Sequence, residues 1–371
     1  MKKLKVMTIL GTRPEIIRLS EVIKQCDMRF DHILVHTGQN WNDCLNKVFF
    51  DNLELRQPDI YLDCVGKHLG ETMGNIISKS FEVMQKEKPD AVLILGDTNS
   101  ALSAISAKRL KIPIFHMEAG NRCWDWNVSE MINRKIVDHI SDINLPYTEH
   151  SRRYLLDEGI DGKTIFVTGS PMREVIEKNK AKIEKSSVLD NLALEKDGYF
   201  LVSAHREENI DIEENFFSLM NAINAIAEEY QLPIIYSVHP RSKKFIELRK
   251  FKFHPLVRQL TPFSYSDYNQ LQINSKCVLS DSGTLSEESA LLHFRGVLIR
   301  TSTERPEVID SGSVIIGGIR TEDVLRATAL AVSMPIPEQV SSEYEKTNVS
   351  EKVVKLIQSY TPIVNKTVWM K

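Results

Sequence analysis

Short apolar runs alternate with longer amphipathic segments along the whole chain. In the first half, strands are expected at Lys5–Leu10, Ile33–His36, Ala91–Leu95, Ile112–Met117 and Ile143–Leu145. In the second half, strands are expected at Tyr199–Ser203, Ile234–Val238, Lys276–Ser280, Gly296–Ile299 and Val314–Ile316. Helices are expected between them, for example at Pro14–Gln25, Asn99–Leu110, Glu214–Tyr230 and Leu285–His293. Apolar strands that alternate with helices in this way are typical of parallel sheets covered on both faces.

Each half of the chain contains enough strand–helix units for a sheet of its own. The fold class is therefore predicted to be α/β, with two Rossmann-like doubly wound domains. The boundary is expected near Gly169-Ser170-Pro171. This boundary gives domains at residues 1–170 and 171–350, followed by a C-terminal segment at 351–371.

Two segments outside these strand–helix units are also expected to be helical. The charged stretch from Glu174 to Lys196 is expected to form a helix on the surface. The end of the chain, from Ser341 to Lys371, is expected to be helical and then irregular. Pro362 is expected to end that helix, because proline lacks the backbone N–H that a helix interior requires.

Composition narrows the class of protein. The chain has 371 residues and a formal net charge of −3, which does not suggest a nucleic-acid partner. Its five cysteines are scattered and form no C-x-x-C pair, so no disulfide framework and no metal site are expected, and a reducing cytoplasm fits. No apolar stretch approaches the roughly 20 residues that span a bilayer. The run Val6–Leu10 is too short for the apolar part of a signal peptide.

The turn after the first strand reads Gly11-Thr12-Arg13-Pro14-Glu15. Glycine permits a tight turn, and proline suits the first turn of the helix that follows. A helix N-terminus can hold a phosphate, and Arg13 and Arg18 would add positive charge. An ordinary strand–helix turn with a solvated arginine is the alternative. The turn is not G-x-G-x-x-G, so it does not predict dinucleotide binding.

Three carboxylates near strand ends are candidates for chemistry. Asp97 follows a strand and is either a catalytic group or a helix cap. Glu118 follows the next strand and is either catalytic or an ion-pair partner of Arg122. Glu130 and Arg134 are spaced i, i+4, so on a helix they share a face. They would form a surface salt bridge or point a carboxylate and a guanidinium toward one substrate.

Histidines follow two strands of the second half. His205 lies in the segment Ser203–Asn209, directly after a strand, where it is a candidate ligand-binding residue or a core histidine. His239 follows another strand in a similar way. Ligands of open parallel sheets bind beyond the carboxyl ends of the strands, which favours the binding role for both.

The turn Ser280–Glu288 is rich in small residues and leads from a strand into a helix. Its backbone N–H groups and the side chains of Ser282 and Thr284, with Gly283 between them, are suited to cradle a diphosphate. Glu287 or Glu288, one turn into the helix, would bind ribose hydroxyls, and Arg305 supplies a further cation. Ser282 does not lie in G-x-S-x-G, so a hydrolase nucleophile is not predicted.

Seven segments together resemble one family, the non-hydrolysing UDP-N-acetylglucosamine 2-epimerases. They keep the family's order from residue 11 to residue 307. The segments are Gly11–Glu15, Gly96-Asp97-Thr98, Glu118-Ala119-Gly120, Glu130 with Asn133-Arg134, His205-Arg206-Glu207, Ser282-Gly283 with Glu287-Glu288, and Thr303–Glu307. Any one of them is weak, whereas the ordered set is specific.

The resemblance implies a fold like that of GT-B glycosyltransferases, with two Rossmann-like domains facing across a cleft. It also implies a homodimer and a C-terminal helix that returns to the first domain. It implies catalysis by Asp97, Glu118 and Glu130 with support from Arg134. The implied UDP-binding residues are Arg13, His205, Ser282, Gly283, Glu288 and Arg305. The family's route, elimination and re-addition of UDP through a glycal, requires no metal or redox cofactor.

Within this family, Gly120–Asp125 and Ser203–Asn209 resemble the UDP-2-acetamido-2,6-dideoxy-L-talose 2-epimerases. Those enzymes form UDP-N-acetyl-L-fucosamine for capsule or O-antigen. The alternatives are epimerisation of UDP-N-acetylglucosamine to UDP-N-acetylmannosamine, a GT-B glycosyltransferase, and a non-catalytic nucleotide-sugar sensor.

The chain departs from the family pattern at three places. Ser129-Glu130-Met131 replaces Pro-Glu-Glu, and Arg18 replaces the usual lysine of the first helix. Gly38-Gln39-Asn40-Trp41 replaces the Gln-His-Arg run that is associated with allosteric binding of UDP-N-acetylglucosamine. Such regulation is therefore not expected.

Overall fold

A computed structural model describes residues 2–38, 50–336, 338 and 340–371. The chain divides into two compact units. The first consists of Met1–Glu177 together with Glu343–Lys371, and the second of Lys178–Ser342. The two ends of the chain therefore belong to the same unit, and the second unit is inserted between them.

The first unit is built on a parallel six-stranded sheet with the order β3-β2-β1-β4-β5-β6. Its strands are β1 (Lys5–Leu10), β2 (Asp31–His36), β3 (Ile60–Tyr61), β4 (Ala91–Leu95), β5 (Ile114–Met117) and β6 (Ile143–Leu145). Five of the six were predicted, and β1, β4 and β6 have the predicted bounds. The sequence analysis missed β3, because two residues are too short for an apolar pattern.

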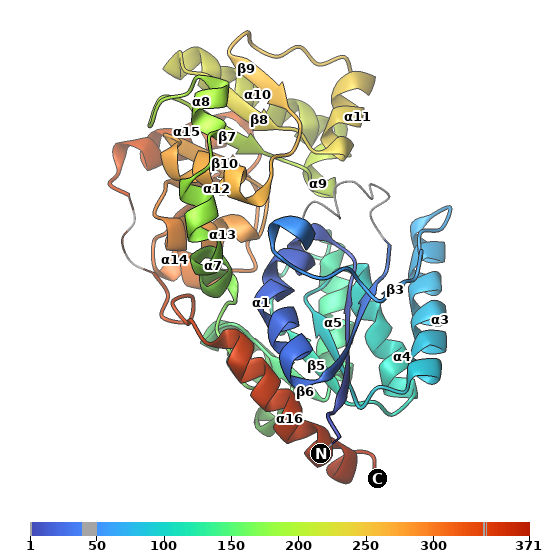
Figure 1. Cartoon of the computed structure of the whole chain (residues 1–371). Coiled ribbons are helices and arrows are strands. Elements are labelled where there is room, and N and C mark those ends of the chain that lie inside the picture. Colours follow the sequence, from blue (N-terminus) through green and yellow to red (C-terminus); the bar gives the residue numbers. More distant parts are fainter. Residues whose placement is uncertain (1, 39–49, 337, 339) are drawn as a thin grey trace. The chain divides into compact units, whose positions relative to one another are not determined.

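Helices cover both faces of this sheet. The helices of the first unit are α1 (Arg13–Arg29), α3 (Leu69–Glu87), α4 (Ser103–Arg109), α5 (Glu130–Ile140), α6 (Glu149–Asp157) and α16 (Val349–Thr367), with short 3-10 turns at Asn99–Leu102 and Gly162–Thr164. Helix α7 (Met172–Glu184) begins in the first unit and continues into the second. On one face α16 packs against α1, and α3, α4 and α5 form a row on the other face (Figure 1). The predicted helix Asn99–Leu110 is thus a 3-10 turn followed by α4.

The second unit has a parallel sheet with the order β12-β11-β10-β7-β8-β9. Its strands are β7 (Phe200–Ser203), β8 (Ile234–Ser237), β9 (Val257–Leu260), β10 (Cys277–Ser280), β11 (Gly296–Leu298) and β12 (Val314–Ile316). Only β9 was not predicted. Two of its four residues are exposed arginine and glutamine, as suits a polar edge strand.

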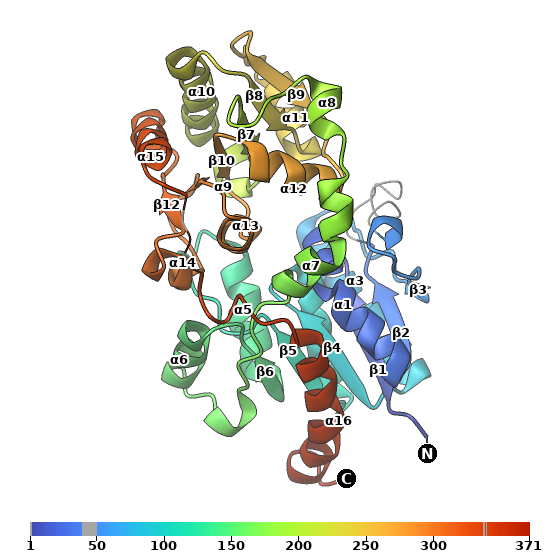
Figure 2. The ribbon, with the colours of Figure 1, turned by 60° about the vertical axis from the view of Figure 1, so that its left-hand side comes forward.

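Apolar cores lie on both faces of the second sheet. Helices α10 (Glu213–Tyr230) and α15 (Thr321–Ser333) cover one face and pack against each other (Figure 2). The other face is covered by α8 (Val188–Leu192), α12 (Tyr265–Asn274) and α13 (Thr284–Leu292). The remaining helices are α9 (Glu207–Ile210), α11 (Pro240–Leu248) and α14 (Pro306–Asp310). The predicted α/β class with two doubly wound parallel sheets is confirmed.

The first unit extends past residue 170 because the beginning of α7 is buried in it. Met172 and Val175 are fully buried. The carboxylate of Glu174 accepts hydrogen bonds from the backbone N–H of Ser350, at 3.2 Å to each oxygen, and so caps the beginning of α16. The prediction that the stretch from Glu174 onward lies on the surface is wrong for this first turn of α7.

Pro362 does not end a helix, contrary to the prediction, because it lies inside α16. The helix continues past it because one face, including Val353, Ile357 and Val364, is buried. Pro362 itself is exposed, so its ring meets solvent. Burial of the opposite face outweighs the cost of a proline, which is about 3 kcal/mol in a helix interior.

No helix among the described residues is long and apolar enough to cross a membrane.

Replacing Pro362 with alanine is expected to raise the free energy of unfolding by about 2 kcal/mol. The new N–H can donate to the carbonyl of Gln358, and this gain exceeds the extra freedom of the unfolded chain. Urea unfolding followed by circular dichroism measures the change. Ser359→Ala, at an exposed position of the same helix, is the control and is expected to change the free energy by less than about 0.7 kcal/mol. A lower unfolding midpoint for Pro362→Ala would contradict this account.

Candidate active site

The turns after β1, β4 and β5 meet at one edge of the first sheet, because these three strands are neighbours. In the turn after β1, Oε2 of Glu15 accepts hydrogen bonds from the N–H of Gly11 at 3.1 Å and the hydroxyl of Thr12 at 2.7 Å. Burial raises the pKa of Glu15 to about 7, against the lowering effect of these hydrogen bonds. The turn is thus closed by its own glutamate, a role that the sequence analysis did not assign. Arg13 begins α1 and is half-buried.

Asp97 follows β4 and is held by two consecutive residues of α5. Its Oδ2 accepts hydrogen bonds from Nε of Arg134 at 2.7 Å and lies 2.6 Å from Nη2. The amide of Asn133 donates to the carbonyl oxygen of Asp97 at 2.9 Å. Asp97 is not the cap of the following turn, since Thr98 fills that position and accepts from the N–H of Ser100. The capping alternative therefore belongs to Thr98, and Asp97 is an arginine-bound carboxylate.

Glu118 follows β5, and each of its carboxylate oxygens has a side-chain partner. Oε2 pairs with Nη1 of Arg18, and both side chains are buried. Oε1 accepts from the amide of Asn121 at 3.2 Å. The backbone of Glu118 is left-handed, with φ of 63°, which costs a residue with a side chain about 1–3 kcal/mol. A Cβ on Gly96 would lie only 3.7 Å from Oε2, so the turns that carry Asp97 and Glu118 are in contact.

Arg122 is not the partner of Glu118, contrary to the alternative raised from the sequence. It is 1% exposed and pairs with Asp138 at 2.8 Å. It also forms a bidentate pair with Glu158, with distances of 2.8 and 2.7 Å. Burial would raise the pKa of Glu158, but Arg122 and Lys135 outweigh burial and lower it to about 2.

A buried histidine–aspartate pair contacts the turns that carry Asp97 and Glu118. Nδ1 of His116 is 3.0 Å from Oδ1 of Asp138, and Nε2 is 2.8 Å from the carbonyl oxygen of Gly96. The N–H of Gly120 donates to both oxygens of Asp138 at 3.2 Å. Burial opposes both charges, yet the pair raises the pKa of His116 and lowers that of Asp138. One pair therefore fixes the residue before Asp97 and the loop after Glu118.

Glu130 is the first residue of α5 and is half-buried. The hydroxyl of Ser129 donates to its Oε2 at 3.2 Å. Met131, where the family pattern has a second glutamate, is 1% exposed. Nη1 of Arg134 lies 3.5 Å from the sulfur of Met131 and 3.7 Å from that of Cys123. Met131 thus packs against the guanidinium that holds Asp97.

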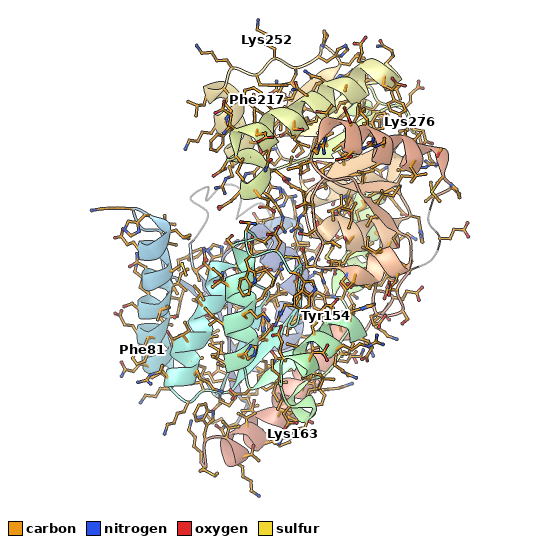
Figure 3. The ribbon with its side chains drawn as sticks, turned by 180° about the vertical axis from the view of Figure 1, so that it is seen from behind. Phe81, Tyr154, Lys163, Phe217, Lys252 and Lys276 are labelled. Carbon is orange, nitrogen blue, oxygen red and sulfur yellow. The ribbon has the colours of Figure 1, made fainter. Side chains whose placement is uncertain are left out.

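The loop after Glu118 carries two tryptophans. Trp124 and Trp126 are 64% and 65% exposed. The ring of Trp124 packs edge-on against Tyr154 of α6, labelled in Figure 3, with centroids 5.5 Å apart. The loop therefore begins with two buried residues, Asn121 and Arg122, and continues with two exposed aromatic side chains.

In the second unit, His205 follows β7 and presents a ring that is 38% exposed, so the core-histidine alternative is wrong. Its ring lies 5.3 Å from that of His239. His239 also caps α11, since its Nδ1 accepts from the N–H of Arg241 at 3.2 Å. The two candidate histidines are therefore neighbours.

The small-residue turn after β10 leads into α13. The hydroxyls of Ser282 and Thr284 lie 3.0 Å apart, and the N–H of Thr284 is 3.3 Å from the Ser282 oxygen. A Cβ on Gly283 would lie 2.8 Å from Oε1 of Glu304, so only glycine fits without a shift. Glu304 accepts from Arg300 at 2.7 Å and lies 3.6 Å from Arg206. This buried ion cluster beneath the turn has no signal in the sequence.

Glu288 and Arg305, both predicted to bind UDP, are buried. Glu288 is 6% exposed and accepts from the amide of Gln272 at 2.7 Å. Arg305 is 1% exposed, and its Nη2 lies 3.6 Å from Oε2 of Glu287. In this structure the contacts of both residues hold α13 in place.

Among the described residues, no cluster of histidine, cysteine or acidic side chains could hold a metal ion. Residues 39–41 of the segment considered for allosteric binding lie outside the described residues.

Comparison with known proteins identifies the family. The family model described as UDP-N-acetylglucosamine 2-epimerase matches residues 24–358. The UDP-N-acetylglucosamine 2-epimerase of Methanocaldococcus jannaschii is 35% identical over 339 residues, which cover 89% of this chain and 93% of that protein. The UDP-2,3-diacetamido-2,3-dideoxy-D-glucuronate 2-epimerase of Pseudomonas aeruginosa is 30% identical over 338 residues, covering 90% and 94%.

Solved structures agree over the full length. The UDP-N-acetylglucosamine 2-epimerase of Rickettsia bellii is 45% identical, with a TM-score of 0.91 and 100% of both chains covered. The Methanocaldococcus jannaschii enzyme in complex with UDP-GlcNAc and UDP is 33% identical, with a TM-score of 0.90 and coverage of 96% and 99%. The family match and these relatives identify an isomerase that acts on UDP-sugars. The chain belongs to the non-hydrolysing UDP-N-acetylglucosamine 2-epimerase family.

The ion pair between buried Arg122 and half-buried Glu158 is expected to make stability depend on pH in acid. Glu158 has a pKa of about 2 when folded, below its ordinary 4.5. Its stabilising charge is therefore fully present above pH 4.5 and is lost as the pH falls toward 2. Glu158→Gln is expected to cost about 1–3 kcal/mol at neutral pH, and this cost should shrink in acid.

Urea unfolding at a series of pH values measures the cost of Glu158→Gln. The control is Glu149→Gln, because Glu149 forms an exposed pair with Arg152. Its cost is expected to stay below about 1 kcal/mol. A constant cost of Glu158→Gln across the acid range would argue against this ion pair.

Proposed function

We propose that this enzyme epimerises C2 of UDP-2-acetamido-2,6-dideoxy-L-talose and yields UDP-N-acetyl-L-fucosamine. The observation that carries the proposal is the contact between Asn121 and Glu118. Asn121 belongs to the Gly120–Asp125 motif that resembles the L-talose enzymes, and its amide donates to the carboxylate that follows β5. The motif thus contacts one of the carboxylates to which this proposal assigns the proton transfer.

The reaction proceeds by elimination and re-addition. A base removes the C2 proton, the C–H electron pair forms a C1–C2 double bond, and the C1–O bond breaks so that UDP leaves with its electron pair. UDP then adds back to C1 while a proton reaches the other face of C2. The departure of UDP is needed because no carbonyl stabilises a C2 carbanion, and general base catalysis supplies only about 10²–10⁴-fold.

In this proposal the first unit supplies the proton chemistry. Asp97, Glu118 and Glu130 are the carboxylates that remove and return the proton. Arg134 pairs with Asp97 and orients its carboxylate, and Arg18 does the same for Glu118. Burial and pairing of these groups provide a site in which charge is arranged before the substrate arrives.

The second unit binds UDP in this proposal, with Arg13 of the first unit as an additional cation. His205 and His239 offer ring nitrogens, and the turn Ser282–Thr284 offers hydroxyls and the N–H groups at the beginning of α13. In this proposal Glu288 binds ribose hydroxyls of UDP, and Arg305 is a further cation for the nucleotide. These groups must bind the diphosphate more strongly in the transition state, when charge develops on it, than in the bound substrate. Only this difference in binding accelerates the breaking of the C1–O bond.

Epimerisation of UDP-N-acetylglucosamine to UDP-N-acetylmannosamine is the second candidate. It is favoured by the names of several relatives, including the Methanocaldococcus jannaschii enzyme. A glycosyltransferase would need a separate acceptor and would not exchange the C2 proton without it. We also expect a cytoplasmic homodimer whose product is used for capsule or O-antigen.

Proton exchange at C2 separates these candidates. Pure protein is incubated in deuterated water with each UDP-sugar, and loss of the H2 signal is followed by proton NMR. Exchange with the L-talose derivative is expected. Exchange with UDP-N-acetylglucosamine alone would exclude the proposed substrate, and exchange with neither sugar would exclude both epimerase candidates.

Glu118→Gln is expected to lower kcat by at least about 10²-fold, because the amide cannot take a proton. UDP affinity, measured by calorimetry, is expected to stay unchanged, since the proposed UDP groups lie mainly in the second unit. Glu149→Gln makes the same chemical change at a glutamate outside the proposed site, and this control should keep full activity. Full activity of Glu118→Gln would remove Glu118 from the mechanism.

A further inference from the structure

Asp281 is a fully buried carboxylate at the end of β10. Strands β10 and β7 are adjacent, and Ser280 lies beside Ser203 in their register. The residues that follow the two strands, Asp281 and the segment from Ala204 to Arg206, therefore meet at one edge of the second sheet. The sequence analysis assigned no role to Asp281.

The two oxygens of Asp281 have different partners. Oδ2 accepts from the backbone N–H of His205 at 2.8 Å and of Arg206 at 2.9 Å, and from the amide of Asn209 at 3.1 Å. Oδ1 lies 3.0 Å from Nδ1 of the His205 ring. Burial would raise the pKa of Asp281, but the nearby histidine and these donors hold it well below its usual range.

An ionised Asp281 determines which ring nitrogen of His205 carries hydrogen. A carboxylate can only accept, so Nδ1 must be the protonated nitrogen that faces it. Neutral His205 is then the Nδ1–H tautomer, and Nε2 is the ring atom left for a ligand. The ring is 38% exposed, so it is accessible in the second unit.

We infer that Asp281 is a positioning residue that fixes His205 as the Nδ1–H tautomer and directs Nε2 to the diphosphate of the bound UDP-sugar. The identity of the ligand rests on the proposed function, whereas the tautomer does not. When His205 is protonated, Nε2–H donates to the diphosphate as the C1–O bond breaks. No covalent bond forms at the histidine, and Asp281 balances the charge of the imidazolium.

The unmodified protein provides the first test. Its histidine rings are labelled with ¹⁵N, and the ring signals of His205 are assigned by comparison with His205→Gln. At a pH where the ring is neutral, the shifts should show hydrogen on Nδ1. Hydrogen on Nε2 would overturn the inference, and this result needs neither a substrate nor a variant of Asp281.

Asp281→Asn provides the second test. Three donors converge on Oδ2, so the amide oxygen takes that place and the NH₂ group faces Nδ1. His205 must then accept at Nδ1 and carry its hydrogen on Nε2. We expect this tautomer switch. We also expect kcat to fall by about 10²–10⁴-fold, because the neutral amide no longer balances the imidazolium that donates to the departing diphosphate. UDP affinity measured by calorimetry should fall much less than kcat.

Asn209→Ala is the matched control, because it removes one donor to the same carboxylate oxygen and leaves the carboxylate charged. It is expected to keep the Nδ1–H tautomer. An unchanged tautomer or an unchanged kcat in Asp281→Asn would overturn the inference. If that variant does not fold, the spectrum of the unmodified protein still decides the tautomer. Absence of C2 proton exchange with every UDP-sugar would instead reject the proposed function.

Discussion

A buried carboxylate stays charged only where cations or several N–H groups face it, and both units depend on this constraint. In the first unit, His116 and Arg122 face the buried carboxylate of Asp138. In the second unit, Asp281 collects donors from the segment after β7. The partners come from different elements in each case. The position of each charged group therefore depends on how these elements pack together in the unit.

The parallel sheets explain why these charges gather at a few turns. The carboxyl ends of parallel strands share one edge, and the turns that follow them cannot be covered by the helices on the faces. The two units use this edge differently. The first places paired carboxylates there, which suits proton transfer, and the second places small residues and histidines there, which suits an anionic ligand.

Most strands could be predicted from the sequence, because a buried parallel strand is a continuous apolar run. The exceptions were β3, with two residues, and the polar edge strand β9. Pro362 was misjudged because local propensity ignores the buried face of α16. The candidate carboxylates were recognised from their places after strands, helped by the family resemblance.

The supporting residues could not be predicted in the same way. His116 lies within a strand and Asp138 within a helix, so each matches an ordinary core or surface position. Arg122 was considered as a partner of Glu118, whereas it pairs with Asp138 and Glu158. Such pairs join residues that are far apart along the chain, and no local pattern contains that information.

The return of α16 to the first unit has a consequence for how the protein is made. The helix packs against α1, although more than three hundred residues separate the two elements in synthesis. During translation the second unit is complete before α16 leaves the ribosome, so the inserted unit can fold while the unit that contains both termini still lacks a helix. The face of α1 that packs against α16 therefore stays uncovered, or is bound by a chaperone, until α16 has been synthesised.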